Sequence, residues 1–403
     1  MSDWIALLRR NPGFARLWLA EAISLVGDWF SLVAISVLAL KDGGGAWAVA
    51  LTLAAHELPM ALMRPIAGVL ADRFDRRNLL IGVHVAQAVL TLGMAWRALL
   101  GDVVGLQLLV LARSVVGGLD WPARSGAIRR LVREEDLMGA NAIGGASWSA
   151  MYAIGMALGG LVSSFGIPLA LAIDAGTFAF AAVLLMALPR IPTRATDGLL
   201  EALRRSVGDL REAARMARSD PHLFRAVAAK TPLGLAGGAA VVMLNVIADR
   251  ASFAGTGAMT LGILQAMRGI GTGVGPLLAE RLVASGLDFG RVWSVAALVA
   301  LVGIGSLALG APWPLLLLAA FVWGTGTGAN WMLSSAEIQK RAPDAAIGRL
   351  SGLDMLSVEG AFAVSALVGG ALIDRYDVPG VAAAFGLVAG AACWVAIRAA
   401  TPR

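Results

Sequence analysis

Six ionisable residues lie in the middle of long apolar stretches of this sequence. They are Glu21, Asp28, Glu57, Arg113, Arg268 and Glu359. Near the centre of a lipid bilayer such a side chain costs about 2.5 to 3.5 kcal/mol on insertion scales, so those that are kept usually face a partner or a water-filled space. Burial disfavours the charged form of a carboxylate, and a proton, a cation or an arginine then neutralises it. The set therefore predicts a site that binds a proton or a solute within the membrane.

Asp28 and Glu57 are the acids best placed to bind such a proton. Asp28 lies in the middle of the first apolar stretch, with Glu21 seven residues earlier on nearly the same helical face, and Glu57 lies in the second stretch, just before Pro59. The alternative is that Asp28 or Glu57 forms a static salt bridge with Arg113 and does not titrate during function. Three further acids lie closer to the ends of their stretches and are expected to be structural or to line an access path: Asp120, Asp174 and Asp354.

The elements that position these residues follow from composition. The chain is 58% hydrophobic and 15% charged, whereas soluble domains carry about 25% charged residues. About 20 mostly apolar residues cross a bilayer as a helix. The candidate spans are residues 17–39, 46–67, 78–99, 104–125, 140–164, 167–189, 226–248, 258–279, 291–310, 313–336, 348–371 and 379–397. We therefore predict an all-α integral membrane protein of 12 transmembrane helices.

The distribution of basic residues predicts the orientation of these spans, because cytoplasmic loops are enriched in Lys and Arg. Of the 33 Lys and Arg residues, 26 fall on the side of the N-terminus, nine of them around the central loop from Arg190 to Lys230, and four fall on the opposite side. Both termini are thus expected in the cytoplasm of a cell whose inner membrane holds the chain. The first apolar run is too long and too charged for a cleavable signal peptide and is expected to remain as an anchor.

A polar segment and a weak internal repeat divide the chain into two halves. Residues 190–225 form the long polar interruption, between an N-terminal part (1–189) and a C-terminal part (226–403). Adding 210 to a position carries Gly118 onto Gly328 and the pair Gly159, Gly160 onto Gly369, Gly370. Such parallel repeats predict two pseudo-symmetric six-helix bundles with a substrate site between them near the bilayer midplane. The linker itself reads as a helix on the anionic inner leaflet or as a solvated connector.

A loop between the second and third spans carries the first family resemblance. Its sequence, Gly68-Val-Leu-Ala-Asp72-Arg73-Phe-Asp75-Arg76-Arg77, resembles the signature loop of the major facilitator superfamily. A small residue there permits close helix contact, and a mixed-charge loop can latch one half to the other and release it. The alternative is an ordinary basic loop with a helix-capping Asp.

Two further elements resemble those of the same superfamily. Arg113 with Gly117 resembles its Arg-x-x-x-Gly element, and Gly155, Gly159 and Gly160 resemble an antiporter element in which Met156 replaces the usual proline. That replacement weakens the antiporter inference, and the glycines are equally explained by close helix packing. Over most of its length the chain looks like the branch that includes the enterobactin exporter and macrolide-efflux-like proteins, whose members export small amphipathic molecules.

Several classes of function are excluded by residues that the sequence lacks. The single cysteine, Cys393, rules out cysteine-based zinc sites. His56-Glu57 lacks the second histidine of a zinc protease. The glycine-rich runs 269–275 and 324–328 lack the Gly-Lys-Ser/Thr ending of a phosphate loop and are read as small-residue faces for helix packing or bending. Basic residues are too scattered to bind nucleic acid. We expect no enzyme activity, no cofactor and no metal.

The combined reading is a secondary active transporter, a proton-coupled exporter of small amphipathic compounds of drug or siderophore type that works by alternating access. Its expected partners are a small-molecule substrate, protons and the lipid bilayer, and a monomer is expected. One alternative keeps the fold but makes the chain an uncoupled facilitator or a lipid flippase. Another is a non-transporting membrane sensor or scaffold.

Overall fold

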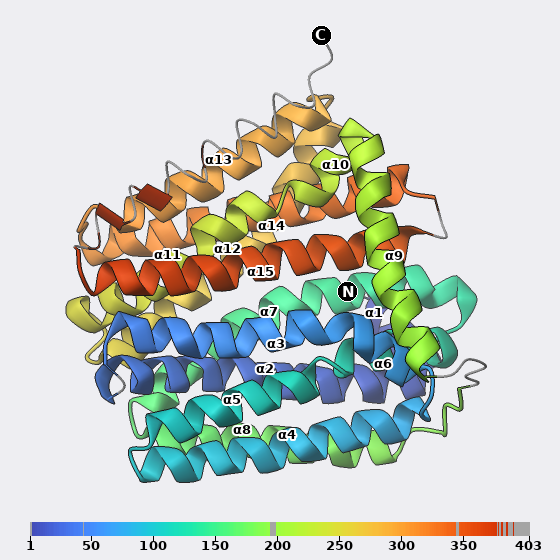
Figure 1. Ribbon diagram of the computed structural model, residues 1–403, viewed down its shortest axis with the longest axis horizontal. Helices are drawn as coiled ribbons and strands as arrows, with labels where there is room; N and C mark the ends of the chain where they lie inside the picture. Colours follow the sequence, from blue (N-terminus) through green and yellow to red (C-terminus); the bar gives the residue numbers. More distant parts are fainter. Residues whose placement is uncertain are drawn as a thin grey trace.

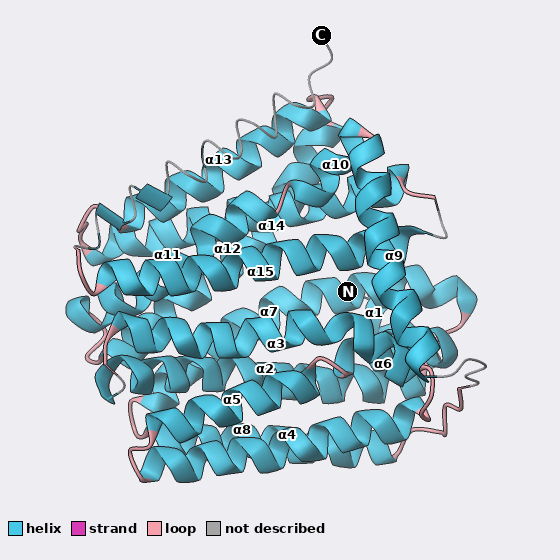
Figure 2. Cartoon of the chain, viewed as in Figure 1, coloured by secondary structure: helices cyan, strands magenta, loops and turns pink. Residues whose placement is uncertain are grey.

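The computed structural model describes residues 2–42, 44–193, 199–343 and 346–376, with the single residues 378, 380, 381, 384, 385 and 390. All regular structure in this part of the chain is helical (Figure 2). The long helices lie side by side, and α9 crosses them at the right-hand end of Figure 1. The all-α prediction is therefore confirmed for the described residues.

The helices form two groups that are joined by α9 (Leu199–Ser219). The first group comprises α1 (Ser2–Arg10), α2 (Pro12–Asp42), α3 (Ala46–Ala71), α4 (Arg76–Leu99), α5 (Val103–Gly117), α6 (Asp120–Leu131), the short 3-10 helix η1 (Glu134–Asp136), α7 (Leu137–Ser163) and α8 (Ile167–Met186). The second comprises α10 (Pro221–Ala228), α11 (Thr231–Ala251), α12 (Gly257–Ala284), α13 (Phe289–Leu307), α14 (Trp313–Arg341) and α15 (Ile347–Ile373). We call these groups the first and the second bundle.

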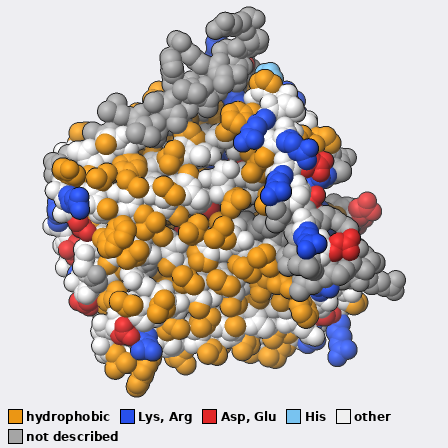
Figure 3. Space-filling view, in the orientation of Figure 1, with side chains coloured by type: hydrophobic (Ala, Val, Ile, Leu, Met, Phe, Trp, Pro, Cys, Tyr) orange, Lys and Arg blue, Asp and Glu red, His pale blue; other side chains and the backbone are white. Residues whose placement is uncertain are grey.

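Ten segments of the described residues are long and apolar enough to cross a membrane. The predicted span 258–279 corresponds to α12, whose many glycines together with Gln265 and Arg268 lower its mean hydropathy. The predicted span 379–397 falls on residues outside the described part, apart from isolated positions. Apolar side chains cover most of the face in Figure 3, with Lys and Arg gathered at its right-hand end. That surface suits contact with lipid.

Two predicted spans are broken rather than continuous. The span 104–125 is divided between α5 and α6 at Gly118 and Leu119, and the span 226–248 is divided between α10 and α11 at Ala229 and Lys230. The second break precedes Pro232, which has no backbone N–H to continue the helical hydrogen bonding and whose ring clashes with the preceding turn.

Glycines allow the closest helix contacts. A Cβ on Gly271 or Gly275 of α12 would lie 2.2 or 2.1 Å from a backbone oxygen of α14, so the interpretation of these glycine runs as packing faces is confirmed. Between the bundles, a Cβ on Gly160 of α7 would lie 2.8 Å from the Cα of Gly262 on α12. The other main contact between bundles joins α3 to α15, which lie side by side in the centre of Figure 1.

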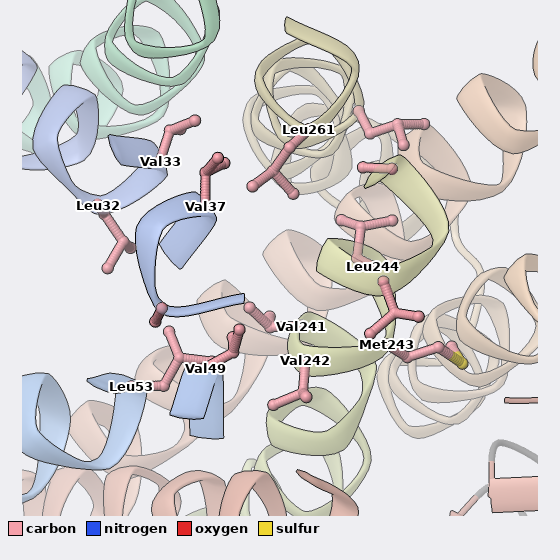
Figure 4. Packing of buried hydrophobic residues seen from close by; sticks show 14 of the residues in the cluster. Leu32, Val33, Val37, Val49, Leu53, Val241, Val242, Met243, Leu244 and Leu261 are labelled. Carbon is pink, nitrogen blue, oxygen red and sulfur yellow. The ribbon is translucent and has the colours of Figure 1, made fainter. Parts of the chain in front are cut away.

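The two bundles meet differently at their two ends. We call the end with α1, the 68–77 loop and α9 the linker end, and the opposite end the distal end. At the distal end one apolar cluster joins both bundles, with Val37 and Val49 of the first bundle and Val241 and Leu261 of the second (Figure 4). The Asp374 carboxylate after α15 also accepts hydrogen bonds there from the backbone N–H groups of Ala46 and Trp47 at the start of α3, both at 3.0 Å.

The apolar clusters at the linker end each stay within one side of the molecule. One joins α9 and α10 to α12, α13, α14 and α15, and the other two join helices of the first bundle alone. The bundles are therefore sealed against each other at the distal end, and no shared apolar cluster of the described residues closes the linker end.

Candidate functional site

Arg113 is the centre of a buried ion network in the first bundle. Its Nη2 lies 2.8 Å from Oδ1 of Asp28 on α2, and its Nη1 lies 3.0 Å from Oδ2 of Asp174 on α8. Nη1 also donates to the hydroxyls of Ser31 at 3.3 Å and Thr91 at 3.5 Å. The side chain of Arg113 is 2% exposed and that of Asp174 is fully buried. One cation is thus shared by two carboxylates.

Asp28 is the member of this network that solvent reaches, with 31% of its side chain exposed. Its helix, α2, contacts α3, α5, α6, α7 and α8 of its own bundle and α11 and α12 of the other. A helix surrounded in this way has little contact with lipid, so the exposed part of Asp28 faces the space between the bundles. The structure therefore contains the salt bridge that the sequence left open as an alternative, and leaves its carboxylate accessible.

Glu21 lies in a second charged network, nearer the linker end. It forms an ion pair with Arg124 of α6, whose guanidinium lies 4.8 Å from the centre of the Trp121 ring. Arg124 is also 3.8 Å from Asp120, which in turn lies 3.9 Å from His84 on α4. Arg124, near the end of the predicted span 104–125, is therefore a partner of an acid within the bundle.

Glu57 is a partly exposed carboxylate on α3 of the first bundle. Its carboxylate is 3.3 Å from Nδ1 of the neighbouring His56, and 21% of its side chain is exposed. It also interacts electrostatically with the hydroxyl of Tyr152 on α7. No arginine or lysine of the described residues forms an ion pair with Glu57. Glu57 is thus separate from the Arg113 network, and the predicted alternative of a Glu57–Arg113 salt bridge is wrong for this conformation.

Arg268 is held by aromatic rings and an amide. Its guanidinium lies 4.3 Å from the ring centre of Trp323 on α14 and 5.4 Å from that of Tyr152, and its Nη1 donates to Oε1 of Gln265 at 3.0 Å. The Tyr152 hydroxyl donates to the same oxygen at 2.8 Å. Because Tyr152 belongs to the first bundle and Gln265 to the second, this group joins the two bundles near the middle of the helices.

Glu359, the sixth candidate, is half-buried on α15 of the second bundle. The sequence analysis did not single out one further buried cation, Lys230. Lys230 contacts the Asp354 carboxylate, donates to Ser335 at 3.1 Å and lies 4.6 Å from the centre of the Trp331 ring. Lys230 was assigned to the central loop, but its side chain is 1% exposed. The signal that was available is its position two residues before Pro232, inside an apolar run.

The signature loop contacts both the first bundle and the segment that follows α8, where the Arg76 N–H donates to the carbonyl of Ile191 at 3.1 Å and the Thr193 hydroxyl donates to that of Phe74 at 2.9 Å. Arg76 is 3.1 Å from Asp72 and donates to the carbonyl of Gly126 at 3.0 Å, Arg77 donates to the carbonyl of Met186, and Asp75 caps α4. Arg73 adjoins them in the turn. A Cβ on Gly68 would meet no atom within 4 Å. The close helix contact expected at Gly68 is therefore not made in this conformation.

The glycines of α7 form a packing surface. A Cβ on Gly155 would lie 2.6 Å from the carbonyl oxygen of Val26, and one on Gly159 would lie 2.5 Å from that of Phe30, so both bring α7 against α2. Gly160 makes the contact with α12. Helix α7 runs without a break from Leu137 to Ser163, as the replacement of proline by Met156 predicts.

Among the described residues, no group of three or more His, Cys, Asp and Glu side chains is placed to hold a metal ion. The arrangement is one of paired charges and aromatic rings around a space that solvent enters.

Comparison with known proteins gives relatives at modest identity. The enterobactin exporter EntS of Shigella flexneri is 25% identical over 376 residues, which cover 91% of this chain and 86% of that protein. An uncharacterised transporter of the major facilitator type, YfiS of Bacillus subtilis, is 28% identical over 186 residues, and this match spans only 44% of the length of YfiS.

Solved structures share the fold. The nucleoside transporter NupG superposes with a TM-score of 0.75 at 16% identity, covering 97% of this chain and all of that chain. A POT family transporter in complex with 5-aminolevulinic acid gives 0.72 at 14% identity, covering 96% and 95%. At these identities the likeness concerns the fold alone.

The family model described as "Transmembrane secretion effector" matches residues 2–402. The predicted superfamily is confirmed, and both relatives and structural neighbours are transporters rather than enzymes. The chain belongs to the transmembrane secretion effector family and is a multi-pass membrane transporter of the major facilitator type.

Proposed function

We propose that this transporter is a proton-coupled exporter of small amphipathic compounds that works by alternating access. The two moving units are residues 1–189 and 226–403, joined by 190–225. Both termini lie in the cytoplasm, so the linker end is the inner end, and the described conformation receives solute from inside. The chain works as a monomer, because each chain holds both bundles.

The observation that carries this proposal is the accessible Asp28 carboxylate beside the buried Arg113. When Asp28 takes up a proton, Arg113 keeps the carboxylate of Asp174, 3.0 Å away, so no cation is left alone in a dry interior. When Asp28 loses its proton, the ion pair at 2.8 Å re-forms. A carboxylate whose partner has a second anion changes its charge at lower cost than one in an isolated pair.

The remaining candidates take supporting roles in this scheme. Glu57, Arg268 and Glu359 line the path of the solute, and Glu21 with Arg124 lies on the route of the proton toward the linker end. The signature loop, with Asp72, Arg73, Arg76 and Arg77, latches the bundles when the linker end closes and releases them when it opens. Support for the latch is the open surface around Gly68, which leaves room for a helix to approach.

Proteoliposomes test the coupling. With the linker end facing outward, an acidic lumen should drive accumulation of fluorescent cationic, anionic or zwitterionic amphipathic dyes in the lumen against their concentration gradient. Asp28→Asn should abolish the accumulation that depends on the pH gradient while the protein stays folded. Asp42→Asn, an exposed position on the same helix, is the matched control and should transport normally.

The same assay separates the alternative of an uncoupled facilitator or lipid flippase. Such a protein equilibrates the dye, or a labelled lipid, without accumulating it, whatever the pH gradient. Accumulation that persists unchanged in Asp28→Asn would remove Asp28 as the coupling residue. No movement of any dye or lipid would favour a sensor or scaffold.

A further inference from the structure

Among the described residues, Arg268 is a cation without an anionic partner. It lies between the Trp323 and Tyr152 rings and donates to the neutral Gln265, and no carboxylate in the described part of the chain lies within ion-pair distance of it. Stacking on aromatic rings stabilises a guanidinium but does not neutralise it. A charge at this depth usually faces a partner or a water-filled space. Arg268 is therefore ready to accept an anionic group from outside the chain.

Glu57 is the complementary anion on the other bundle. The imidazole of His56 is its nearest ionisable group, at 3.3 Å, and its side chain is partly exposed. Glu57 and Arg268 both interact electrostatically with Tyr152, yet they do not form an ion pair with each other. Opposite charges from the two bundles thus act on the same tyrosine without forming an ion pair with each other.

An aromatic surface adjoins these two charges. Trp29 of α2 packs edge-on against Trp148 and Tyr152 of α7, with ring centres 5.6 and 4.7 Å apart, and Trp148 stacks on Tyr152 at 5.5 Å. The side chain of Trp148 is 40% exposed. Tyr152, on which it stacks, turns toward Gln265 of the second bundle, so this cluster faces the junction of the bundles. Trp148 offers its exposed part to an aromatic or apolar body, and Tyr152, which is 2% exposed, supports it from beneath.

We propose that the site between Glu57 and Arg268 binds solutes that carry one basic and one acidic group on an aromatic or apolar body. The acidic group pairs with Arg268, the basic group pairs with Glu57, and the body lies against Trp148, the exposed ring of the aromatic cluster. Such a solute bridges the two bundles by its own charges. This inference rests on the proposed function, since the bound solute is the transported one.

Four dansyl probes test this charge selectivity in purified protein in lipid nanodiscs. Nε-dansyl-lysine carries both charges, dansylcadaverine only the basic group, dansylglycine only the acidic group, and dansyl amide neither. Binding is measured from the rise in dansyl fluorescence on transfer to an apolar site. Nε-dansyl-lysine should bind about tenfold or more tightly than the neutral probe, because charge-assisted hydrogen bonds outweigh neutral ones.

Two variants assign the charges. Arg268→Gln should reduce the affinity for Nε-dansyl-lysine to that for dansylcadaverine and leave dansylcadaverine itself within about twofold, and Glu57→Gln should do the converse with dansylglycine. Arg268→Lys keeps the cation and should retain most of the selectivity. Equal binding of all four probes, or equal weakening of all four by either variant, would overturn the inference.

The result is independent of proton coupling. Equilibrium binding needs no gradient, so selective binding without gradient-driven transport leaves this inference intact and removes the proton-coupled exporter. Gradient-driven transport of all dyes without charge selectivity would support the proton-coupled exporter and remove the charge-selective site.

Discussion

The guanidinium of Arg113 lies 3.0 Å from the carboxylate of Asp174 at a place where solvent reaches neither side chain. Asp174 comes from α8 and Arg113 from α5, so the pair joins two helices inside the first bundle. Asp28 adds a second carboxylate on the side open to solvent. Both acids therefore depend on Arg113 as their cation, whereas Arg113 keeps one carboxylate partner when the other is removed.

Removing Arg113 should destabilise the protein far more than removing Asp174. Arg113→Gln leaves the fully buried carboxylate of Asp174 without its cation, and loss of one partner from a buried ion pair costs about 3 to 5 kcal/mol. We expect a clear fall in the unfolding temperature, measured by tryptophan fluorescence in detergent. Asp174→Asn leaves Arg113 with Asp28 and keeps an amide oxygen as acceptor, so its unfolding temperature should fall much less. Equal losses in both variants would contradict this ordering.

Asp374 should hold the distal end closed. Its carboxylate accepts two hydrogen bonds at the start of α3, where backbone N–H groups and the helix dipole favour a negative charge. Loss of a helix cap costs about 1 kcal/mol, so Asp374→Ala should shift the balance between closed and open distal ends by about fivefold. Spin labels on the distal ends of α2 and α11 would measure it as a larger population of long distances.

A matched control for Asp374 lies at the same end of the molecule. Asp249 is 3.8 Å from Lys41, and about half of each side chain is exposed. Exposed ion pairs contribute about 0 to 1 kcal/mol. Asp249→Asn should therefore leave the distance distribution close to that of the unaltered protein. A shift as large as that of Asp374→Ala would mean that any loss of negative charge opens this end.

The membrane fold was predictable because it depends on long-range averages along the chain. About twenty apolar residues define a span whatever their order. The chain has more apolar residues than the core of a soluble domain would bury. Helix breaks were harder to predict. The break before Pro232 follows a rule about proline, whereas the break at Gly118 follows from the approach of another helix, on which the Cβ of Met63 lies 2.8 Å from the place that a Cβ on Gly118 would take.

The partners within the site could not be predicted to the same extent. The apolar context of Asp28 and Arg113 marks both as unusual, and the sequence named their salt bridge as one alternative. Lys230 was misjudged because its place at the edge of a span led to its assignment to the central loop, whereas Asp174, expected to be structural or to line an access path, is a buried partner of Arg113. Whether an ionisable residue faces lipid, a neighbouring helix or water depends on the rotation of each helix, which hydropathy does not specify when both faces are apolar.

The contact of Gly160 with Gly262 should tolerate no side chain. A Cβ at Gly160 would lie 2.7 Å from the carbonyl oxygen of Ala258 and 2.8 Å from the Cα of Gly262, and backbone atoms cannot move aside singly. Gly160→Ala should push α7 from α12 and cost about 1 to 3 kcal/mol as overpacking does. Gly144→Ala is the control on the same helix, where a Cβ would meet no atom within 4 Å. The unfolding temperatures of the two variants should differ clearly.

Lys230 and Asp354 should depend on each other more than on the rest of the protein. Both side chains are almost fully buried, so Lys230→Met or Asp354→Leu alone leaves an unpaired charge and should cost about 3 to 5 kcal/mol. The double variant leaves no charge, and hydrophobic replacements of a buried pair are often neutral or stabilising. Its unfolding temperature should therefore exceed that of either single variant.

The exposed ion pair of Arg349 with Glu212, at 2.7 Å, provides the comparison. Glu212→Gln removes a partner that is half exposed, so water replaces it and the change in stability should be about 1 kcal/mol or less. If the stability losses of Lys230→Met and Asp354→Leu were additive in the double variant, the two side chains would be uncoupled. Each would then have to be stabilised by other contacts, which for the lysine are Ser335 and Trp331. If the stability changes are non-additive for Lys230 and Asp354 but not for Arg349 and Glu212, the coupling energy belongs to the buried ion pair. In that pair alone, removing one charge leaves the other buried without a partner.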